Sequence, residues 1–407
     1  MDIRKELEKN LDNMISHMQG LIRIPSIAGE AEGDYPFGKE VQRALDYMLQ
    51  LGASMGFEVK NVDNYGAHID FPGTGDGIMA IVGHIDVVPE GEGWTHGPFD
   101  GDVVDGWMYG RGTQDDKCPT IIGLYAMKIL KDLGFKPKKT IRLILGLDEE
   151  ANWDGMKYYL EKEKAPDFGI VPDADFPLVQ CEKGLLEFDI VKGNGKFSDA
   201  LGTKGLLLES ISGGSAPNVV AGHAVIQIAG DLNEIAETEK RINEKAVLKD
   251  YEIKTWIENE KLMVKTIGKT AHASYPERGK NAISMAMDLI GEIEFNNGDA
   301  NTLLKFYNEQ IGFALDGSKI GCAMKDELSG NLTFNVGKIS FDQTETKLTI
   351  DIRYPVTKSQ ESVFSGIRPI AEKSGFRLEL LDHIKAIYQE SDHPVVVTLV
   401  EVYREIS

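Results

Sequence analysis

Three near-continuous apolar segments, each ending in ionisable residues, constrain the fold of this chain more than any other feature. They are IMAIVGHID (78–86), TIRLILGLDEE (140–150) and DFGIVPDA (167–174). An apolar run without alternation is typical of a strand that is covered on both faces. Helical spacing of apolar residues predicts helices before and between these strands, at 2–23, 37–55, 119–133 and 153–164. Buried strands that alternate with helices predict an α/β fold, an αβα hydrolase-like sandwich with a largely parallel sheet.

The texture of the sequence changes at about residue 185. From there, apolar and polar residues alternate in strand-like segments, with helical segments at 279–294 and 358–374 between some of them. These strand-like segments are 185–193, 223–230, 261–268, 331–342 and 347–355. This pattern predicts an inserted α+β domain at 185–380, flanked by the αβα domain at 1–184 and a helical return to it at 381–407.

Charge and composition exclude several classes of protein. The chain has 65 acidic and 44 basic residues, a formal net charge of −21, which repels the phosphate backbone of nucleic acids. No apolar stretch reaches the roughly 18–20 residues of a membrane span, and the charged N-terminus lacks the apolar region of a signal peptide. The three cysteines are too few for a disulfide framework. We therefore expect a cytoplasmic globular protein that binds neither nucleic acid nor membrane.

Ionisable residues cluster where the predicted buried strands end. His84 and Asp86 end the first strand, and Glu149 and Glu150 end the second. Two further carboxylates occupy comparable places: Asp115 in a Gly-rich turn before a helix, and Asp173 after the third strand. Side chains at the carboxyl ends of strands in an α/β sheet gather at one rim. The sequence thus predicts one histidine and several carboxylates around a common site.

Such a cluster suits divalent cations. Close carboxylates repel one another and must share protons or hold cations. A mixed histidine and carboxylate set favours zinc, with manganese or cobalt as alternatives, and the lack of cysteine ligands argues against a structural zinc site. Two metals about 3.5–4 Å apart would activate a water and polarise a carbonyl. In the Glu149–Glu150 pair, one residue could bind metal while the other takes the proton of the water.

Each residue also has a plainer interpretation when it is taken alone. A histidine at a strand end is more often a hydrogen-bonded core residue, and Asp115–Asp116 could cap a helix. Glu149–Glu150 could begin a solvated loop, and Asp173 could belong to a turn. The joint occurrence of all these residues at strand ends is what favours a metal site.

Five motifs resemble a known family. They are GHIDVVPEGEGWTHGPF (83–99), DGWMYGRGTQDDKCP (105–119), LDEE (147–150), PDADFP (172–177) and EKG (182–184). They resemble the di-zinc exopeptidases that include carboxypeptidase G, aminoacylase and succinyl-diaminopimelate desuccinylase. GEGW, the run from Met156 to Pro177, and SGGSAPNVV (212–220) resemble the PepV-like dipeptidases, which are related to bacterial carnosinases.

The resemblance implies a role for each residue of the site. Asp86 would orient the imidazole of a ligand, and Glu149 would be the general acid and base. The implied metal ligands are His84, Asp115 as the bridge, Glu150 and Asp173. The resemblance also implies that 185–380 is a lid domain whose His272, in TAHASYPERGKNA (270–282), stabilises the oxyanion. Asn218 and Arg353 would bind substrate, and a monomer would hydrolyse dipeptides with free termini.

Two departures from the family pattern leave alternatives open. Cys118 stands where the family usually has glycine, so its thiol could crowd the metals or act as a further soft donor. The family pattern continues with a Gly-rich segment and a late histidine ligand, whereas the sequence ends at YREIS, with His383 and His393 outside such a motif. The 381–407 portion is therefore expected to be incomplete. The alternatives are an N-acyl amino acid deacylase and a catalytically impaired metal- or peptide-binding relative.

Overall fold

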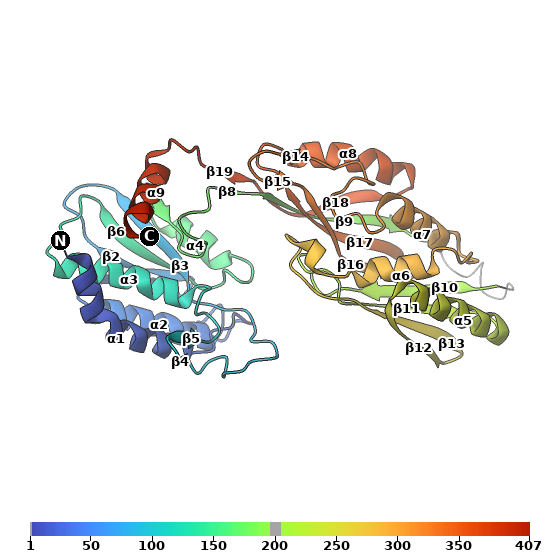
Figure 1. The fold of residues 1–407 in the computed structure, drawn as a ribbon, viewed down its shortest axis with the longest axis horizontal. Helices are drawn as coiled ribbons and strands as arrows, with labels where there is room; N and C mark the ends of the chain where they lie inside the picture. The colour runs from blue at the N-terminus through green and yellow to red at the C-terminus, as the bar shows by residue number, and fades with distance from the viewer. Residues whose placement is uncertain (1, 196–204) are drawn as a thin grey trace. The chain divides into compact units, whose positions relative to one another are not determined.

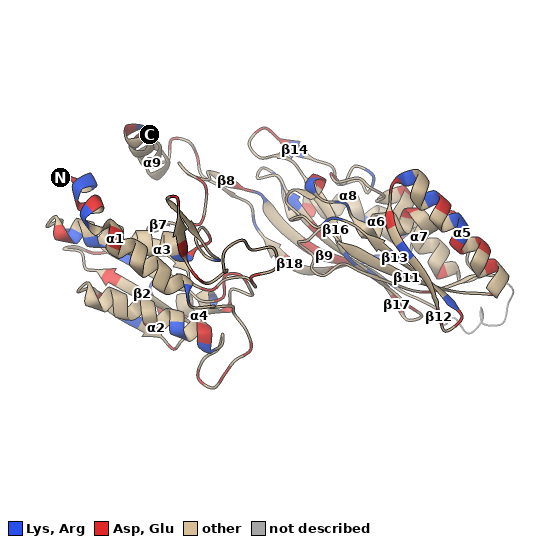
Figure 2. Cartoon of the chain, turned by 60° about the horizontal axis from the view of Figure 1, so that its bottom comes forward, with Lys and Arg blue, Asp and Glu red and all other residues tan. Residues whose placement is uncertain are grey.

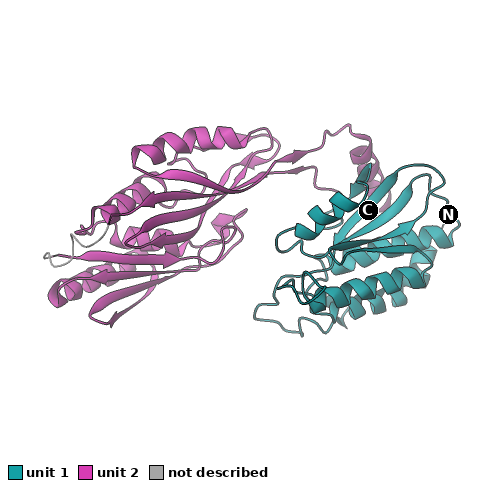
Figure 3. Cartoon of the chain, turned by 180° about the vertical axis from the view of Figure 1, so that it is seen from behind, with its two compact units in different colours: residues 1–176 teal, residues 177–407 magenta. Residues whose placement is uncertain are grey.

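The computed structural model describes residues 2–195 and 205–407, in two compact units, residues 1–176 and residues 177–407 (Figure 3). The predicted boundaries at 184/185 and 380/381 separate segments to which the sequence assigns different functional roles, and they stay a prediction.

Acidic and basic residues alternate along the exposed face of helices such as α5 (Leu232–Lys249) (Figure 2). Among the helices of the described ranges, none combines the length and the apolar character that a membrane span requires.

A five-stranded sheet forms the centre of the first unit, in the order β1-β2-β6-β3-β7. Its strands are β1 (Glu58–Val62), β2 (Gly66–Phe71), β3 (Ile78–His84), β6 (Thr140–Gly146) and β7 (Phe168–Ile170). β3 pairs in parallel with β6 and β7, but β2 is antiparallel to β1 and β6. The prediction of a largely parallel sheet is therefore wrong at this edge. Asp63 and Asn64 have positive φ in a turn too short for a parallel crossover, so β1 and β2 form a hairpin.

Helices cover both faces of this sheet (Figure 1). They are α1 (Ile3–Ile22), α2 (Lys39–Ser54), α3 (Lys117–Asp132) and α4 (Asp154–Lys162). Leu143 and Leu145 of β6 belong to the apolar cluster formed with α1, α2 and α3. Ile144, between them, points to the other face and packs in a cluster with Tyr159 of α4. This alternation along one strand confirms the predicted αβα arrangement.

Several element boundaries in this unit differ from the prediction. β3 ends at His84 rather than at residue 86, and β7 ends at Ile170 rather than at residue 174. β7 is an edge strand with Phe168 and Gly169 exposed, so the expectation that it is covered on both faces is wrong.

α3 begins at Lys117, two residues before the expected start at Pro119, because the Thr120 amide already donates to the carbonyl of Asp116 at 2.9 Å. Proline fits the first turn of a helix, where its missing N–H has no intrahelical partner to lose. β6 ends at Gly146 rather than at residue 150, so Glu149 and Glu150 lie in the loop that precedes α4.

The second unit is built on an eight-stranded antiparallel sheet in the order β12-β13-β11-β10-β16-β17-β9-β18. Its strands are β9 (Gly184–Gly193), β10 (Leu207–Gly213), β11 (His223–Ala229), β12 (Glu252–Glu258), β13 (Lys261–Ile267), β16 (Thr333–Phe341), β17 (Glu345–Tyr354) and β18 (Arg377–Ile384). The helices α5, α6 (Ala282–Ile290), α7 (Gly298–Gln310) and α8 (Gln360–Lys373) gather on one face (Figure 1). Buried residues alternate along β13, as expected for a sheet with one covered face.

The remaining elements of the described residues are short strands, one turn of 3₁₀ helix and a further α-helix. They are β4 (Asp102–Val104), β5 (Trp107–Tyr109), β8 (Cys181–Glu182), η2 (Pro276–Arg278), β14 (Lys325–Asp326), β15 (Gly330–Asn331), β19 (Ile387–Tyr388) and α9 (Pro394–Ile406). The helix expected at 393–407 is confirmed as α9. The prediction that the chain returns to helix directly after residue 380 is wrong, because β18 continues to Ile384 as an edge strand paired with β9.

We predict that Leu143→Ala destabilises the first unit by about 2–5 kcal/mol, the usual cost of such a truncation in a core. The Leu143 side chain is fully buried in the central strand β6, so its removal leaves a cavity between the sheet and α3. Denaturant unfolding followed by circular dichroism measures the change. Leu160→Ala on α4, where the side chain is 47% exposed, is the matched control and should stay within about 0.5 kcal/mol of the parent protein. Equal losses in the two variants would contradict the assigned core.

Candidate metal centre

His84 ends β3 with its imidazole buried and held in one tautomer. The residue is 3% exposed, and its Nδ1 lies 3.1 Å from the backbone carbonyl oxygen of Asp86. A carbonyl oxygen can only accept a hydrogen bond, so Nδ1 carries the proton in the neutral ring. The Nε2 atom is then left with an unshared electron pair, which is the form in which imidazole binds a metal.

Carboxylate oxygens surround this Nε2 atom. It lies 3.0 Å from Oδ1 of Asp115, 3.5 Å from Oδ2 of Asp173 and 3.9 Å from Oε2 of Glu149. Within the described residues, Nε2 is buried and makes no hydrogen bond. Potential ligand atoms of His84, Asp115 and Asp173 all lie within 4.8 Å of one another. Electron pairs that face each other at these distances need a proton or a cation between them, so the donor set fits a divalent metal.

The ionisation of the site reflects this crowding. Burial opposes a charge on His84, but the neighbouring carboxylates of Asp115, Asp173 and Asp86 outweigh it and raise the pKa of the imidazole. Burial also raises the pKa of Glu149, and burial with the nearby charge of Asp115 raises the pKa of Glu150 to about 7. A metal ligand must give up its proton, so a cation would take the place of the protons that these groups retain.

Asp86 and Asp116 accept hydrogen bonds that fix the segments carrying the cluster. Asp86 is fully buried and its Oδ2 accepts a hydrogen bond from the amide of Glu150 at 3.0 Å, while its Oδ1 is 3.3 Å from Nδ1 of His84. Oδ2 of Asp116 accepts from the His84 amide at 3.1 Å and from Oγ1 of Thr120 at 3.0 Å. The two aspartates thus connect the end of β3 to the Glu150 loop and to the start of α3. The Asp116 side chain is an organising residue that sequence reasoning did not assign.

Asp148 was also missed by sequence reasoning. Its two carboxylate oxygens accept hydrogen bonds from the amides of Asp154 and Gly155, at 2.7 Å and 2.9 Å, in the first turn of α4. The residue is 2% exposed, so these bonds fix the loop that carries Glu149 and Glu150. An acidic residue five positions before the helix predicted at 153–164 was the available signal, because helix N-termini offer free amides to anions.

Cys118 does not lie where the sequence suggested. The thiol is 5% exposed, belongs to the apolar cluster below α3, and its Sγ contacts Sδ of Met108 at 3.8 Å. Burial raises the pKa of this thiol to about 12. The expectation that Cys118 crowds the metals or acts as a soft donor is therefore wrong, because the side chain packs on the core side of the helix.

The other three predicted residues lie in the second unit. Backbone bonds join the Asn218 and His272 segments: Val219 bridges His272, and the amide of Ala273 donates to the carbonyl of Asn218 at 2.9 Å. Both side chains are exposed. Nδ1 of His272 accepts from the amide of Ser274 at 3.1 Å, so Nε2 is the nitrogen that carries hydrogen in the neutral ring. Burial and the charge of Arg353 lower the pKa of His272, which favours that neutral form.

Arg353 of β17 is held by Asp351 on the same strand. The guanidinium Nε and Nη2 atoms donate to the two carboxylate oxygens at 3.1 Å and 3.0 Å. Asp351 is fully buried, so the pair is more than a surface ion pair. The signal for Asp351 was its spacing, because residues two apart on a strand point to the same face.

The late histidines have local partners in the described structure. Nε2 of His383 lies 2.8 Å from the hydroxyl of Tyr354, and Nδ1 of His393 accepts from the Val395 amide at 3.4 Å to cap α9. In sum, the first unit brings together His84, Asp86, Asp115, Glu149, Glu150 and Asp173, and the second brings together Asn218, His272 and Arg353.

The comparisons with known proteins agree with this architecture. The profile of peptidase family M20/M25/M40 matches residues 80–406. "Putative dipeptidase YtjP" of Bacillus subtilis (strain 168) is 32% identical over 409 residues, which cover 99% of this chain and 86% of that relative. The chain therefore belongs to peptidase family M20/M25/M40.

Solved structures share the fold. Human carnosine dipeptidase 1 superposes with a TM-score of 0.53 at 13% identity, over 99% of this chain and 84% of that one. The M20 family metallo-carboxypeptidase Sso-CP2 from Sulfolobus solfataricus also gives a TM-score of 0.53, at 15% identity, over 97% of this chain and 83% of that one. The predicted family and α/β fold class are confirmed, and the protein is an enzyme, a hydrolase that acts on peptides.

Proposed function

We propose that this peptidase hydrolyses dipeptides with free termini, using two divalent cations held by His84, Asp115, Glu150 and Asp173. One observation carries the proposal: Nε2 of His84 is buried, makes no hydrogen bond within the described residues, and faces carboxylate oxygens of Asp115 and Asp173 at 3.0 Å and 3.5 Å. Zinc suits this donor set best, and manganese or cobalt are the alternatives. The printed name of the Bacillus subtilis relative supports dipeptides as the substrate class.

Glu149 would move the proton in this reaction. When bound, the cations acidify a water molecule and polarise the scissile carbonyl group. Glu149 takes the proton of the water while the water oxygen bonds to the carbonyl carbon. It then gives that proton to the leaving nitrogen as the carbon–nitrogen bond breaks, which yields one free acid and one free amine. Its raised pKa suits both transfers, because a general acid and base works best near the ambient pH.

The second unit would bind the substrate. The N–H of His272 Nε2 would donate to the oxygen that becomes negative in the tetrahedral intermediate. Arg353 would pair with the terminal carboxylate, since a guanidinium offers two parallel donors to such a group. The exposed amide of Asn218, on the segment joined to His272, would hold a further polar group of the substrate.

The domain roles are part of the same proposal. Residues 1–184 would form the metal-binding domain, 185–380 the lid, and 381–407 a return to the catalytic domain. The motifs of the metal site fall in the first of these segments, and His272, Asn218 and Arg353 fall in the second. A monomer in the cytoplasm completes the proposal, and the low cysteine content fits a reducing compartment.

The predicted result is chelator-sensitive cleavage of free dipeptides. Purified protein would be assayed with dipeptides, with N-acetylated and C-amidated dipeptides, and with N-acetyl and N-succinyl amino acids. We expect free dipeptides to exceed the blocked compounds by at least about 10²-fold in kcat/KM, because unpaired recognition groups reject analogues strongly. Removing metal should stop turnover, and zinc, manganese or cobalt should restore it. Preference for N-acyl amino acids would replace the proposal by deacylation, and activity that survives complete metal removal would contradict it.

A further inference from the structure

Two loops of the second unit carry the proposed substrate-binding residues. We call residues 214–222 the Asn218 loop and residues 268–281 the His272 loop. Backbone hydrogen bonds join them at three points: Val220 N to Ala271 O at 2.9 Å, Ala273 N to Asn218 O at 2.9 Å, and Gly268 N to Gly222 O at 2.8 Å. A shift of the Asn218 loop would therefore move the His272 loop with it.

Asn335 of β16 fixes the Asn218 loop through two side-chain hydrogen bonds. Its side-chain nitrogen donates to the carbonyl oxygens of Pro217 at 2.9 Å and Val219 at 3.1 Å, which flank Asn218 in the sequence. Only the amide nitrogen can face two carbonyl oxygens, so the orientation of this side chain is fixed by its partners. Asn335 is 2% exposed, and a buried bond of this kind is costly to lose.

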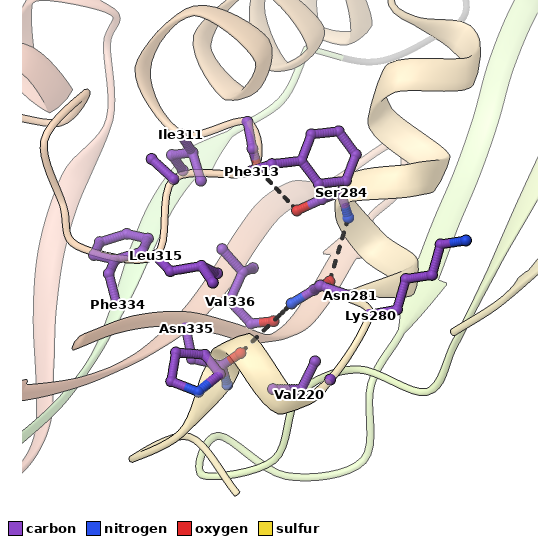
Figure 4. A pocket seen from close by; sticks show the side chains of 14 residues that line it. Val220, Lys280, Asn281, Ser284, Ile311, Phe313, Leu315, Phe334, Asn335 and Val336 are labelled. Atoms are coloured by element: carbon purple, nitrogen blue, oxygen red, sulfur yellow. Dashed lines mark hydrogen bonds between the residues drawn. The ribbon is translucent and has the colours of Figure 1, made fainter. Parts of the chain in front are cut away.

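Asn281 anchors the end of the His272 loop to the same strand. Its Nδ2 donates to the carbonyl oxygen of Val336 at 2.9 Å and lies 3.5 Å from Oδ1 of Asn335. Its Oδ1 accepts from the amides of Ile283 and Ser284 and so caps α6. Figure 4 shows the two asparagines side by side, with Asn281 bonded toward α6 and toward β16.

Packing beneath the two loops is incomplete. A partly open pocket of about 150 Å³ lies between parts of the two loops, the strand β16 and the segment after α7, and Val220, Pro276 and Gly279 of the loops line it (Figure 4). A close-packed protein interior leaves few voids larger than a water molecule. The two loops therefore make fewer apolar contacts on the side of this pocket than they would in such an interior. Asn335 and Asn281 lie at the edge of this pocket, and their hydrogen bonds join the loops to β16 there. The position of the loops therefore depends more on these hydrogen bonds than on apolar packing.

Gly337 allows the close approach that the Asn335 bonds require. It lies at a bulge in β16, and a Cβ atom built on it would be 2.3 Å from the Pro217 oxygen and 2.6 Å from the Ala216 oxygen. Both neighbours are backbone atoms, so any side chain at Gly337 would push the Asn218 loop away from the strand.

We propose that Asn335 is a positioning residue, which sets the Asn218 and His272 loops in the geometry needed to bind substrate and its oxyanion. This inference rests on the proposed function for the roles of Asn218 and His272. Asn335 itself need not contact the substrate, because its two hydrogen bonds act on the backbone at each side of Asn218.

Asn335→Asp is the first test, because it keeps the shape and replaces two N–H donors by carboxylate oxygens. We expect kcat/KM for a dipeptide to fall by about 10²-fold, as when a reacting group is misplaced by about 1 Å. The matched control is Asn297→Asp: Asn297 is also buried, and its Nδ2 donates to the carbonyl of Leu208 at 2.8 Å, away from both loops. The control should lose comparable stability and keep kcat/KM within about twofold.

The pH profile separates positioning from general destabilisation. A protonated carboxyl group at position 335 could again donate one hydrogen bond, and burial raises the pKa of such a group. The ratio of kcat/KM in Asn335→Asp to that of the parent protein should therefore rise as pH falls, whereas the ratio for Asn297→Asp should stay flat. Gly337→Ala should reproduce the loss without this pH dependence, and it serves as the test if Asn335→Asp does not fold.

Hydrogen–deuterium exchange tests the positioning without any activity. The amides of Val220 and Ala273 should exchange faster in Asn335→Asp and in Gly337→Ala than in the parent protein or Asn297→Asp. Unchanged exchange at both amides would overturn the inference, as would an unchanged kcat/KM in Asn335→Asp. If the parent protein cleaves no dipeptide, the proposed function fails, while the exchange result still decides the role of Asn335.

Discussion

Replacing Glu149 by glutamine is expected to lower kcat by about 10²–10⁴-fold, the usual contribution of a general acid and base. The amide keeps the size of the side chain but cannot take the proton of the attacking water. Because Glu149 is not among the proposed metal ligands, the variant should still bind two metal ions. Steady-state kinetics with a dipeptide, together with elemental analysis of the same sample, measures both properties.

The control for this change is Glu161→Gln on α4, an exposed glutamate outside the cluster. It makes the same chemical change in the same unit and should leave kcat and metal content unaltered. Near-normal turnover in Glu149→Gln would exclude Glu149 as the proton carrier. Loss of metal together with turnover would instead identify Glu149 as a ligand, which contradicts the proposed ligand set.

Replacing Asp115 by asparagine is expected to have the largest effect, a loss of turnover of about 10⁴-fold or more. Asp115 supplies the oxygen closest to Nε2 of His84, at 3.0 Å, and would bridge both cations. Removing its charge should weaken metal binding by more than the roughly 10–100-fold that loss of a partner behind a ligand costs. Kinetics and metal titration by calorimetry test the two parts.

Asp105→Asn is the control for the Asp115 change. Asp105 is exposed in the turn between β4 and β5 and has a φ of 51°, a conformation that asparagine tolerates well. This variant should keep full turnover and full metal affinity. If Asp115→Asn binds two metals as tightly as the parent protein, the bridging role is wrong.

Side chains at the carboxyl ends of strands in an α/β sheet gather at one rim, and this explains why part of the metal cluster could be predicted from the sequence. An apolar run marks β3, and His84 at its end was placed at the carboxyl rim of the sheet from this pattern alone. Asp115 precedes α3 in a Gly-rich turn, and Asp173 follows the short edge strand β7 by three residues, so the pattern indicated these two less directly. The supporting hydrogen bonds could not be predicted in the same way. The bond from the Glu150 amide to Asp86 joins residues 64 positions apart, and its geometry depends on how both loops turn.

In the second unit, the alternation of apolar and polar residues predicted some strands and missed others. β13 alternates cleanly between buried and half-buried residues and was predicted at nearly its observed bounds. β10 was missed because a bulge between Leu208 and Ser210 shifts the register and breaks the period of two. The role proposed for Asn335 is invisible for another reason: its partners, Pro217 and Val219, lie more than 100 residues earlier in the chain.

Metal analysis of the purified parent protein, by elemental mass spectrometry after equilibration with zinc, tests the central claim most directly. The account predicts two tightly held zinc ions per chain, with dipeptide cleavage that rises as they are bound. A protein that binds no zinc, or that binds it equally well after His84 and Asp115 are both replaced by alanine, would contradict the account.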